Sequence, residues 1–144
     1  MNRVDDNTII LKEGDRNNCL YKVVYGSLTY YINYGKEDEF LIGVLGKGKC
    51  FGAVGFLSKQ PSPYTYVTNS ESLILEVQEK DFQDFVTKNP KNAIDIMTSM
   101  SKQVSLLQTH LSMLIGELND DSQKKKMLTD SLKEKIKLYQ TYSF

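Results

Sequence analysis

Few side chains in this sequence have the reactivity that catalysis or metal binding requires. The chain has a single histidine, His110, and two cysteines, Cys19 and Cys50. A metal site or a general base needs convergent partners, and no spacing in the sequence supplies them. The cysteines lie on or near predicted strands, so we interpret them as small buried residues rather than a redox pair. No catalytic residue, metal ligand or cofactor is predicted.

The motifs of common enzyme classes are also absent from the sequence. There is no Gly-x-Ser-x-Gly, P-loop or dinucleotide fingerprint, and the pair Gly46 and Gly48 is too sparse to form one. A jelly-roll enzyme with histidine ligands would need more than one histidine. We therefore predict that the chain is not an enzyme.

Charge and hydropathy argue against nucleic acid and membrane partners. The chain carries 18 basic and 18 acidic residues, for a net charge of +0, whereas nucleic-acid binders show a basic excess or face. The basic run at 124–126 is offset by Asp120, Asp121 and Asp130, which is typical of a solvated helix face. No stretch approaches the roughly 18 apolar residues that span a bilayer. With no apolar signal core at the N-terminus, we expect a cytoplasmic protein.

Short strands dominate the first half of the chain. Glu13-Gly14-Asp15 and Gly46-Lys47-Gly48 are turn signals between runs rich in aromatic and β-branched residues. The predicted strands cover 8–11, 20–25, 28–34, 40–45, 65–68 and 73–77. Short antiparallel strands at close spacing favour a β-roll, a double-stranded jelly roll.

The second half is predicted to be helical. A short amphipathic segment at 80–86 ends at Asn89-Pro90, and apolar residues then recur in alternating steps of four and three from Ala93 to Leu118. That heptad pattern indicates a helix that pairs with a second copy. The predicted dimer interface consists of Met97, Met100, Val104, Leu107, Leu111 and Leu114. Asn119-Asp120-Asp121 interrupts the helix, and a last helix is expected over 122–139.

The predicted fold class is therefore α+β. An antiparallel β-roll at 1–90 is followed by a long dimerisation helix at 91–118 and a short C-terminal helical tail at 119–144. We expect the protein to form a homodimer through the long helix.

The order of these elements resembles the effector domain of the catabolite-activator (CRP/FNR) family of bacterial regulators, whose members carry a cyclic-nucleotide-binding domain. Three segments are similar to family motifs in order and spacing: Glu13-Gly14-Asp15 before Leu20-Tyr21, Gly26-Ser27-Leu28, and Leu45-Gly46-Lys47-Gly48 followed by Phe51-Gly52. The resemblance covers 8–118. It implies a role in signal transduction and transcription regulation. The family's winged helix-turn-helix has no room in 119–144.

The resemblance also implies a ligand site, the phosphate cassette, and this sequence departs from it. The family cassette begins at Phe-Gly-Glu and ends at Arg-Ser-Ala-Thr, with the arginine forked onto the cyclic phosphate. Here Ala53 replaces the glutamate and Ser62 replaces the arginine. Each lost charge-assisted pair forfeits about 1.5–3 kcal/mol. We expect that cyclic AMP is not bound in the usual way, unless Lys59 supplies the charge in a shifted register.

Two hypotheses remain for the cassette. Because alternate strand residues share a face, Ser62, Tyr64 and Tyr66 are expected to point inward together. Either an unidentified, less polar effector stacks on the tyrosines, or the tyrosines plug the pocket, which ordinary strand packing favours. The candidate pocket residues are Gly52, Ala53, Val54, Ser62, Tyr64, Thr65 and Tyr66.

The predicted function is a ligand-sensing regulatory and dimerisation module. The alternatives are a ligand-free protein–protein adaptor and a truncated DNA-binding regulator.

Overall fold

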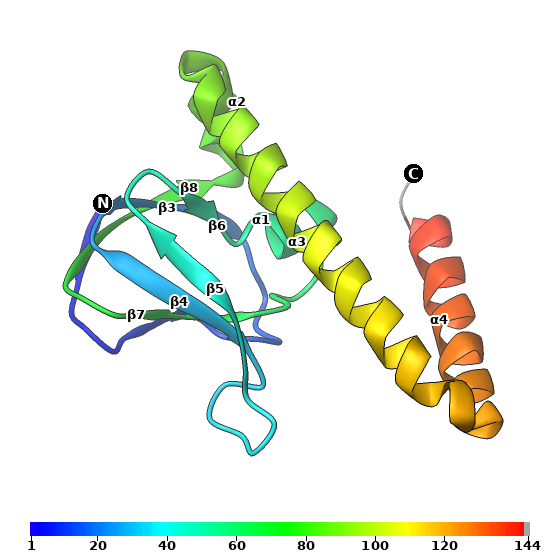
Figure 1. The fold of residues 1–144 in the computed structure, drawn as a ribbon. Helices are drawn as coiled ribbons and strands as arrows, with labels where there is room; N and C mark the ends of the chain where they lie inside the picture. The colour runs from blue at the N-terminus through cyan, green and yellow to red at the C-terminus, as the bar shows by residue number, and fades with distance from the viewer. Residues whose placement is uncertain (143–144) are drawn as a thin grey trace. The chain divides into compact units, whose positions relative to one another are not determined.

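The computed structural model describes residues 1–142, and the side chains of all of these except 120 and 139–142 (Figure 1). The chain divides into two compact units, Met1–Ser101 and Lys102–Phe144. The first unit holds all eight strands and the start of the long helix, and the second is helical in its described part.

The first unit is built on two four-stranded sheets in which every paired strand is antiparallel. One sheet has the order β1-β8-β3-β6 and the other β2-β7-β4-β5. The strands are β1 (Asn2–Val4), β2 (Ile9–Leu11), β3 (Cys19–Tyr25), β4 (Ser27–Ile32), β5 (Phe40–Gly46), β6 (Cys50–Phe51), β7 (Thr65–Thr68) and β8 (Ser72–Gln78). This arrangement confirms the predicted antiparallel roll.

The tight connection between β3 and β4 depends on a glycine. Gly26 has a φ of 86°, in the left-handed region that favours glycine. A Cβ atom at this position would lie 2.2 Å from Ser72 Oγ and 2.6 Å from the carbonyl oxygen of Glu71. The connection between β3 and β4 therefore needs a residue with no side chain.

Three helices complete the first unit, and their ends follow ordinary rules. They are α1 (Ala53–Ser58), α2 (Glu79–Lys88) and the start of α3 (Pro90–Glu117). Glu79 and Asp81 lie in the first turn of α2 and Lys88 in its last, which complements the helix dipole. Pro90 is the first residue of α3, where its missing N–H costs no hydrogen bond.

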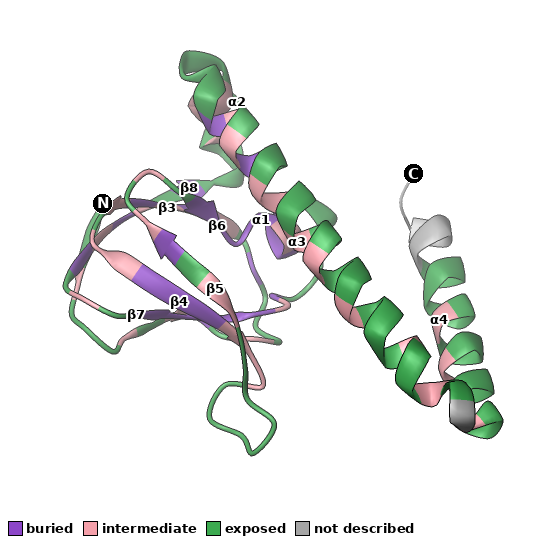
Figure 2. Ribbon diagram, in the orientation of Figure 1, coloured by how far each residue is buried: buried purple, intermediate pink, exposed green. Residues whose placement is uncertain are grey.

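Two hydrophobic clusters hold this unit together. The first lies inside the roll and consists of buried residues, all of them on strands except Tyr64; buried segments are purple in Figure 2. The second joins the roll to the helices: Leu20, Cys50, Ala53, Phe56, Val77 and Ile96 form it, with Phe82, Phe85 and Met100 packed against it. Burying this much apolar surface supplies the main driving force for docking α1 and α3 on the roll.

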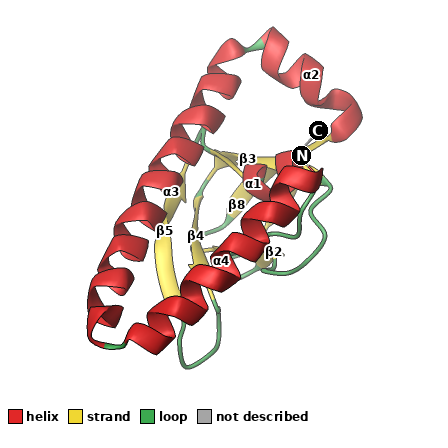
Figure 3. Ribbon diagram, turned by 90° about the vertical axis from the view of Figure 1, so that its right-hand side faces the viewer, coloured by secondary structure: helices red, strands yellow, loops and turns green. Residues whose placement is uncertain are grey.

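The second unit contains the end of α3, the short 3-10 turn η1 (Leu118–Asp120) and α4 (Ser122–Tyr142), joined as shown in Figure 3. The backbone N–H of Lys124 donates to Asp121 Oδ1 at 3.1 Å, which caps the first turn of α4. The predicted order of a long helix, a break and a last helix is confirmed. Within the described residues, no helix has the length and apolarity needed to cross a membrane.

Candidate functional site: the cassette between the roll and the long helix

The cassette begins at Gly52, which is positioned by contacts on several sides. Gly52 has a φ of 75° and precedes the first turn of α1. Its carbonyl oxygen accepts from Asn17 Nδ2 and from the backbone N–H of Phe56, the latter at 3.1 Å. A Cβ atom at Gly52 would lie 3.1 Å from the Tyr21 ring and 3.2 Å from Asn17 Nδ2. The backbone of Gly52 thus approaches the roll interior closely because it is a glycine.

The end of the cassette is tied to the Glu13-Gly14-Asp15 turn. The backbone N–H of Gly14 donates to the Ser62 carbonyl at 2.8 Å, and the Ser62 N–H donates to the Asp15 carbonyl at 2.9 Å. The Ser62 hydroxyl donates to the carbonyl of Tyr64 at 2.7 Å, and Ser62 is 2% exposed. The Ser62 hydroxyl therefore has its hydrogen-bond partner within the same loop, in the backbone two residues on.

Aromatic rings fill the roll interior next to the cassette. Tyr66 lies 4.9 Å from the ring of Phe51 and 5.4 Å from that of Tyr30, and Phe51 stacks on Tyr21 at 5.1 Å, all measured between ring centroids. Tyr64 meets Tyr30 edge-on at 5.3 Å. Each of these side chains is at most 9% exposed, and none carries a positive charge.

Burial raises the pKa of three tyrosines of this group, Tyr21, Tyr64 and Tyr66. Burial raises the pKa of Tyr66, and a hydrogen bond with the Gly52 backbone opposes that rise. Burial also raises the pKa of Tyr64, with a smaller contribution from Tyr30. Burial is the largest cause of the raised pKa of Tyr21, and the nearby Cys19 and Glu76 raise it further, to about 12. These rings could offer phenol hydroxyls to an anionic ligand, but they provide no positive charge to pair with it.

Sequence comparison identifies the family of this cassette-bearing roll. The sequence model of the cyclic nucleotide-binding domain matches residues 1–89, more than half of the chain. The chain belongs to the cyclic nucleotide-binding domain family.

Solved structures share the fold of this cyclic nucleotide-binding domain. The catabolite activator protein of Thermus thermophilus aligns with a TM-score of 0.66 and 18% identity, over 78% of this chain and 53% of that one. A transcriptional regulator of Thermotoga maritima aligns at 0.64 and 16%, over 78% and 88%. The heme domain of CooA from Carboxydothermus hydrogenoformans aligns at 0.64 and 17%, over 79% and 78%. At these identities the likeness concerns the fold alone.

Curated relatives are much longer than this chain. Patatin-like phospholipase domain-containing protein 6 of human and of mouse is 24% identical over 101 residues, which cover 70% of this chain. Those residues are 7% of the human protein and 8% of the mouse protein. The chain therefore spans under a tenth of the length of these relatives.

The predicted pocket residues of the domain occupy different surroundings. Tyr66 belongs to the hydrophobic cluster inside the roll, Gly52 directly precedes α1, and Ser62, Tyr64 and Thr65 are each at most 3% exposed. Ala53 instead belongs to the second hydrophobic cluster, on the helix side. The Thr65 hydroxyl oxygen accepts from the backbone N–H of Glu13 at 3.0 Å. Val54, the remaining candidate, is only partly buried on α1.

Lys59 lies outside the roll interior. Its Nζ pairs with Glu79 Oε1 at 2.6 Å and lies 5.2 Å from the ring centroid of Phe56. Lys59 and Glu79 line an open groove of about 460 Å³, together with Arg16 and Asn17 among others. The charge of Lys59 is thus engaged at the surface.

Some contributors to the site were not predicted from the sequence. Asn17 is 6% exposed and binds the Gly52 carbonyl, while its neighbour Asn18 is exposed. Tyr21 and Tyr30 supply rings from β3 and β4. The alternation of β3 and β4 marks them as strands, but does not say which tyrosine reaches the cassette.

The predicted dimer residues on α3 are mostly exposed in the single chain. Met97, Val104, Leu107, Leu111 and Leu114 range from 37% to 59% exposed. Met100 is partly buried, because it packs against the second hydrophobic cluster. Apolar residues at heptad spacing are typical of helices that pack against another helix.

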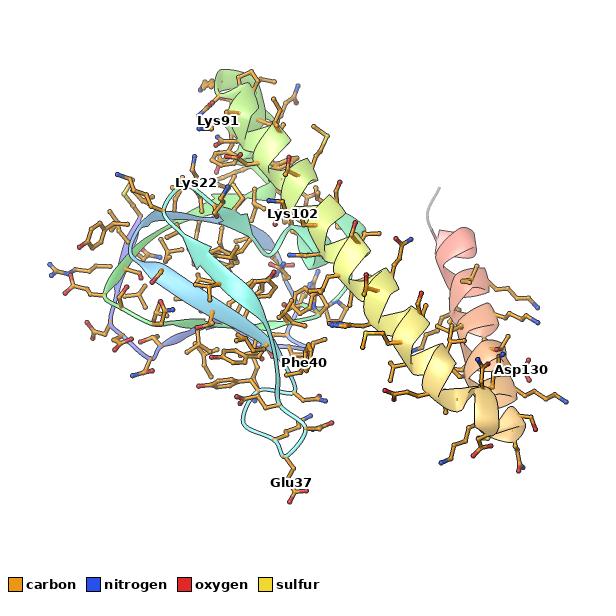
Figure 4. All side chains as sticks on the ribbon, viewed as in Figure 1. Lys22, Glu37, Phe40, Lys91, Lys102 and Asp130 are labelled. Atoms are coloured by element: carbon orange, nitrogen blue, oxygen red, sulfur yellow. The ribbon has the colours of Figure 1, made fainter. Side chains whose placement is uncertain are left out.

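A polar contact fixes the beginning of α3 on the roll. Lys22 Nζ on β3 donates to Asn92 Oδ1 at 2.7 Å, and Asn92 Nδ2 donates to the Phe85 carbonyl at 3.0 Å. Lys22 projects toward the first turns of α3 (Figure 4). Asn92 is 4% exposed, so these hydrogen bonds join β3, α2 and α3 at a site that is largely shielded from solvent.

Proposed function

We propose that this cyclic nucleotide-binding domain is a regulatory dimerisation module that does not bind cyclic AMP in the usual way. One observation carries the proposal: five aromatic side chains fill the roll interior beside Gly52, and none of them is charged. A buried cyclic phosphate requires a charge-assisted partner, since an unpaired buried charge is expensive.

The cassette has a route by which it can influence the long helix. Phe51 packs in the first hydrophobic cluster, whereas Ala53 and Phe56 pack in the second, which contains Ile96 of α3. A displacement of α1 would therefore change the packing of Ile96 and bias the helix between two arrangements. That is how a regulatory domain transmits a local change, through contacts that differ between two states.

We propose that the partner of the exposed α3 residues is a second copy of the chain. The heptad spacing supports this occupant, because a two-stranded coiled coil buries that row. Each leucine that becomes fully buried would contribute about 1.5–3 kcal/mol. The two free cysteines support a reducing, cytoplasmic location for the dimer.

The alternative to a ligand-sensing module is an adaptor that binds other proteins without any small-molecule ligand. The buried tyrosines favour a ligand-free protein–protein adaptor over a sensor for an uncharged, aromatic-stacking effector. Native mass spectrometry of the purified protein discriminates between them, since a bound effector adds its mass to the protein.

The first test combines native mass spectrometry with titration calorimetry, using added cyclic AMP. We expect a dimer with no heat of binding at micromolar nucleotide. Tight uptake of cyclic AMP would show that the cassette works without the missing charges, and the proposal would be wrong.

The dimer is tested with matched helix variants. Leu107→Glu with Leu111→Glu places charges in the heptad row and should give a monomer by light scattering. Gln108→Glu with Ser112→Glu adds the same two negative charges at exposed positions outside the predicted interface, and should leave the dimer intact. If both pairs of substitutions gave the same oligomeric state, the exposed apolar residues of α3 would not be the dimer interface.

A further inference from the structure

An open groove of about 460 Å³ lies beside the cassette, outside the roll interior, and we call it the outer groove. One wall comes from the turn between β2 and β3, with Gly14, Arg16 and Asn17, and the other from the chain that follows α1, with Lys59 and Pro61. Its volume is within the range of small-molecule sites in proteins, roughly 300–1,000 Å³.

Hydrogen bonds of the main chain hold these two walls together. The Gly14 N–H donates to the Ser62 carbonyl at 2.8 Å, and the Ser62 N–H donates to the Asp15 carbonyl at 2.9 Å. Arg16 and Pro61 add an antiparallel β-bridge. The groove is therefore formed before a ligand arrives, and a preformed site loses less conformational entropy on binding.

Arg16 is the cation of the outer groove that has no acidic partner. The chain has two arginines, Arg3 and Arg16. Arg3 forms an ion pair with Glu71, whereas Arg16 forms none with any residue that the structure describes. The Nε of Arg16 donates to Asn18 Oδ1 at 3.1 Å. That bond orients the guanidinium and leaves its two Nη groups for a ligand.

The charges of the outer groove favour an anion. Lys59 Nζ and Glu79 Oε1 lie 2.6 Å apart and largely neutralise each other, so Arg16 gives the groove a net positive charge. A guanidinium binds the oxygens of a carboxylate or a phosphate through two parallel hydrogen bonds. The side-chain amides of Asn18 and Gln60, which also line the groove, can donate to further oxygens.

Asn17 connects the outer groove to the cassette. It lines the groove but is only 6% exposed. Its Nδ2 donates to the Gly52 carbonyl, which also accepts from the Phe56 N–H of α1 at 3.1 Å. Its Oδ1 accepts from the Cys19 N–H at 3.4 Å. A ligand that rests on Asn17 therefore contacts a side chain that holds the N-terminal end of α1.

We infer that the outer groove is an effector site for a small organic oxyanion, a carboxylate or a phosphate: Arg16 binds the oxyanion, and Asn17 transmits its presence to Gly52 and α1. This inference rests on the proposed function, because it gives the regulatory module a ligand outside the filled roll interior. It also favours the sensor over the adaptor, since an adaptor has no effector.

NMR titration of the isotope-labelled full chain tests the site with phenyl phosphate and benzoate, two probes that differ in the oxyanion. We expect at least one of them to bind at millimolar concentration and to shift the amide signals of Gly14, Arg16 and Gln60. The probe that binds more tightly identifies the oxyanion. Benzyl alcohol has the ring without the charge and should shift none of these signals. If neither probe binds, or if benzyl alcohol binds equally well, the inference is wrong.

Matched variants test the anchor. Arg16→Met removes the guanidinium and should weaken binding of the probe by about tenfold or more, the equivalent of one charge-assisted hydrogen bond. Arg3→Met makes the same change at the arginine that is already paired, and should leave the affinity unchanged. Glu79→Gln removes the opposing carboxylate and should tighten binding. Equal affinities of Arg16→Met and Arg3→Met, or weaker binding by Glu79→Gln, would overturn the inference.

The amide signals of Gly52 and Phe56 report on the link to the cassette. They should shift over the same range of probe concentration as the signals of the groove. A groove that fills while these two signals stay unchanged would overturn the role of Asn17. Cyclic AMP is titrated separately, because it is itself an organic phosphate. Shifts at Tyr30 and Tyr66 would place it in the roll interior and refute the proposed function, whereas the two probes and the Arg16 variant decide on the outer groove.

Discussion

The contact between Lys22 and Asn92 offers a quantitative test of how the roll holds the long helix. Asn92→Ala removes two hydrogen bonds, one from the Lys22 ammonium at 2.7 Å and one to the Phe85 carbonyl at 3.0 Å. It leaves the lysine and the carbonyl without this partner in a partly buried place. We expect the variant to lower the free energy of unfolding of the first unit.

The size of the effect follows from the two bonds. A hydrogen bond to a charged group contributes about 1.5–3 kcal/mol, and a neutral one about 0.5–1.5 kcal/mol. Alanine returns about 0.5 kcal/mol through its better helix propensity. The net loss is therefore about 1.5–4 kcal/mol, which moves the urea midpoint down by about 0.8–2 M for an m-value near 2 kcal/mol/M.

A double-mutant cycle isolates the contact itself. Lys22→Met, Asn92→Ala and the double variant are unfolded in urea and followed by circular dichroism. The coupling between the two sites should reach about 1.5–3 kcal/mol. Lys91→Met, an exposed lysine beside Asn92 on α3, serves as the control and should show no coupling. A Lys22–Asn92 coupling as small as that of the control would refute the idea that this bond fixes α3.

Three further outcomes are expected. Gly26→Ala should cost more than ~3 kcal/mol, because its Cβ would meet Ser72 Oγ at 2.2 Å. Gly14→Ala has the same left-handed φ in open space and should cost about 1–2 kcal/mol; equal losses by thermal melting would contradict the steric account. Cys50 should react with a thiol reagent at pH 8 far more slowly than the half-buried Cys19, since it is 4% exposed and burial raises its pKa to about 11; comparable rates would mean that the site opens readily. Between pH 9 and 11 the unfolded thiol of Cys50 ionises while the folded one keeps its proton, so stability should fall with rising pH by about 2–3 kcal/mol. Cys50→Ala should flatten that fall in urea titrations, and an unchanged slope would assign the loss to other groups.

Much of the fold could be predicted from the sequence because the local signals agree with the final structure. The run at 65–68 is β7 as predicted, and the run at 40–45 differs from β5 by one residue. Turn residues with positive φ, such as Gly14 and Gly48, separate the strands as expected. The heptad run lies on α3, which begins at Pro90, one residue before the predicted start at 91, because proline suits a first turn.

Two strands were not predicted, and both depend on distant partners. In β1, Asn2 and Arg3 are exposed and only Val4 is apolar, so the segment has no strand pattern of its own. It is a strand because it pairs with Ser72–Ile74 of β8. Strand β6 has only two residues, and its pairing with Tyr21 and Lys22 defines it.

The site was harder to predict than the fold. Ser62, Tyr64 and Tyr66 are all buried, but strand alternation is not the reason. Ser62 and Tyr64 precede β7, and every residue of β7 is buried, because β7 lies inside its sheet with β2 on one side and β4 on the other. The sequence also cannot distinguish Asn17 from Asn18, since the two have the same type and differ only in which one faces Gly52.

The pairing of the first strands with the last ones has a consequence for synthesis of the chain. Asn2 pairs with Ile74, and Ile9 with Val67, so β1 and β2 gain their partners only after β7 and β8 have emerged from the ribosome. Contacts of such long sequence separation slow folding, because loop closure precedes the contacts that repay it. During that interval β4 and β5, which pair with each other, are the only consecutive strands of the described roll that have found a partner, and their apolar face stays open to other nascent chains.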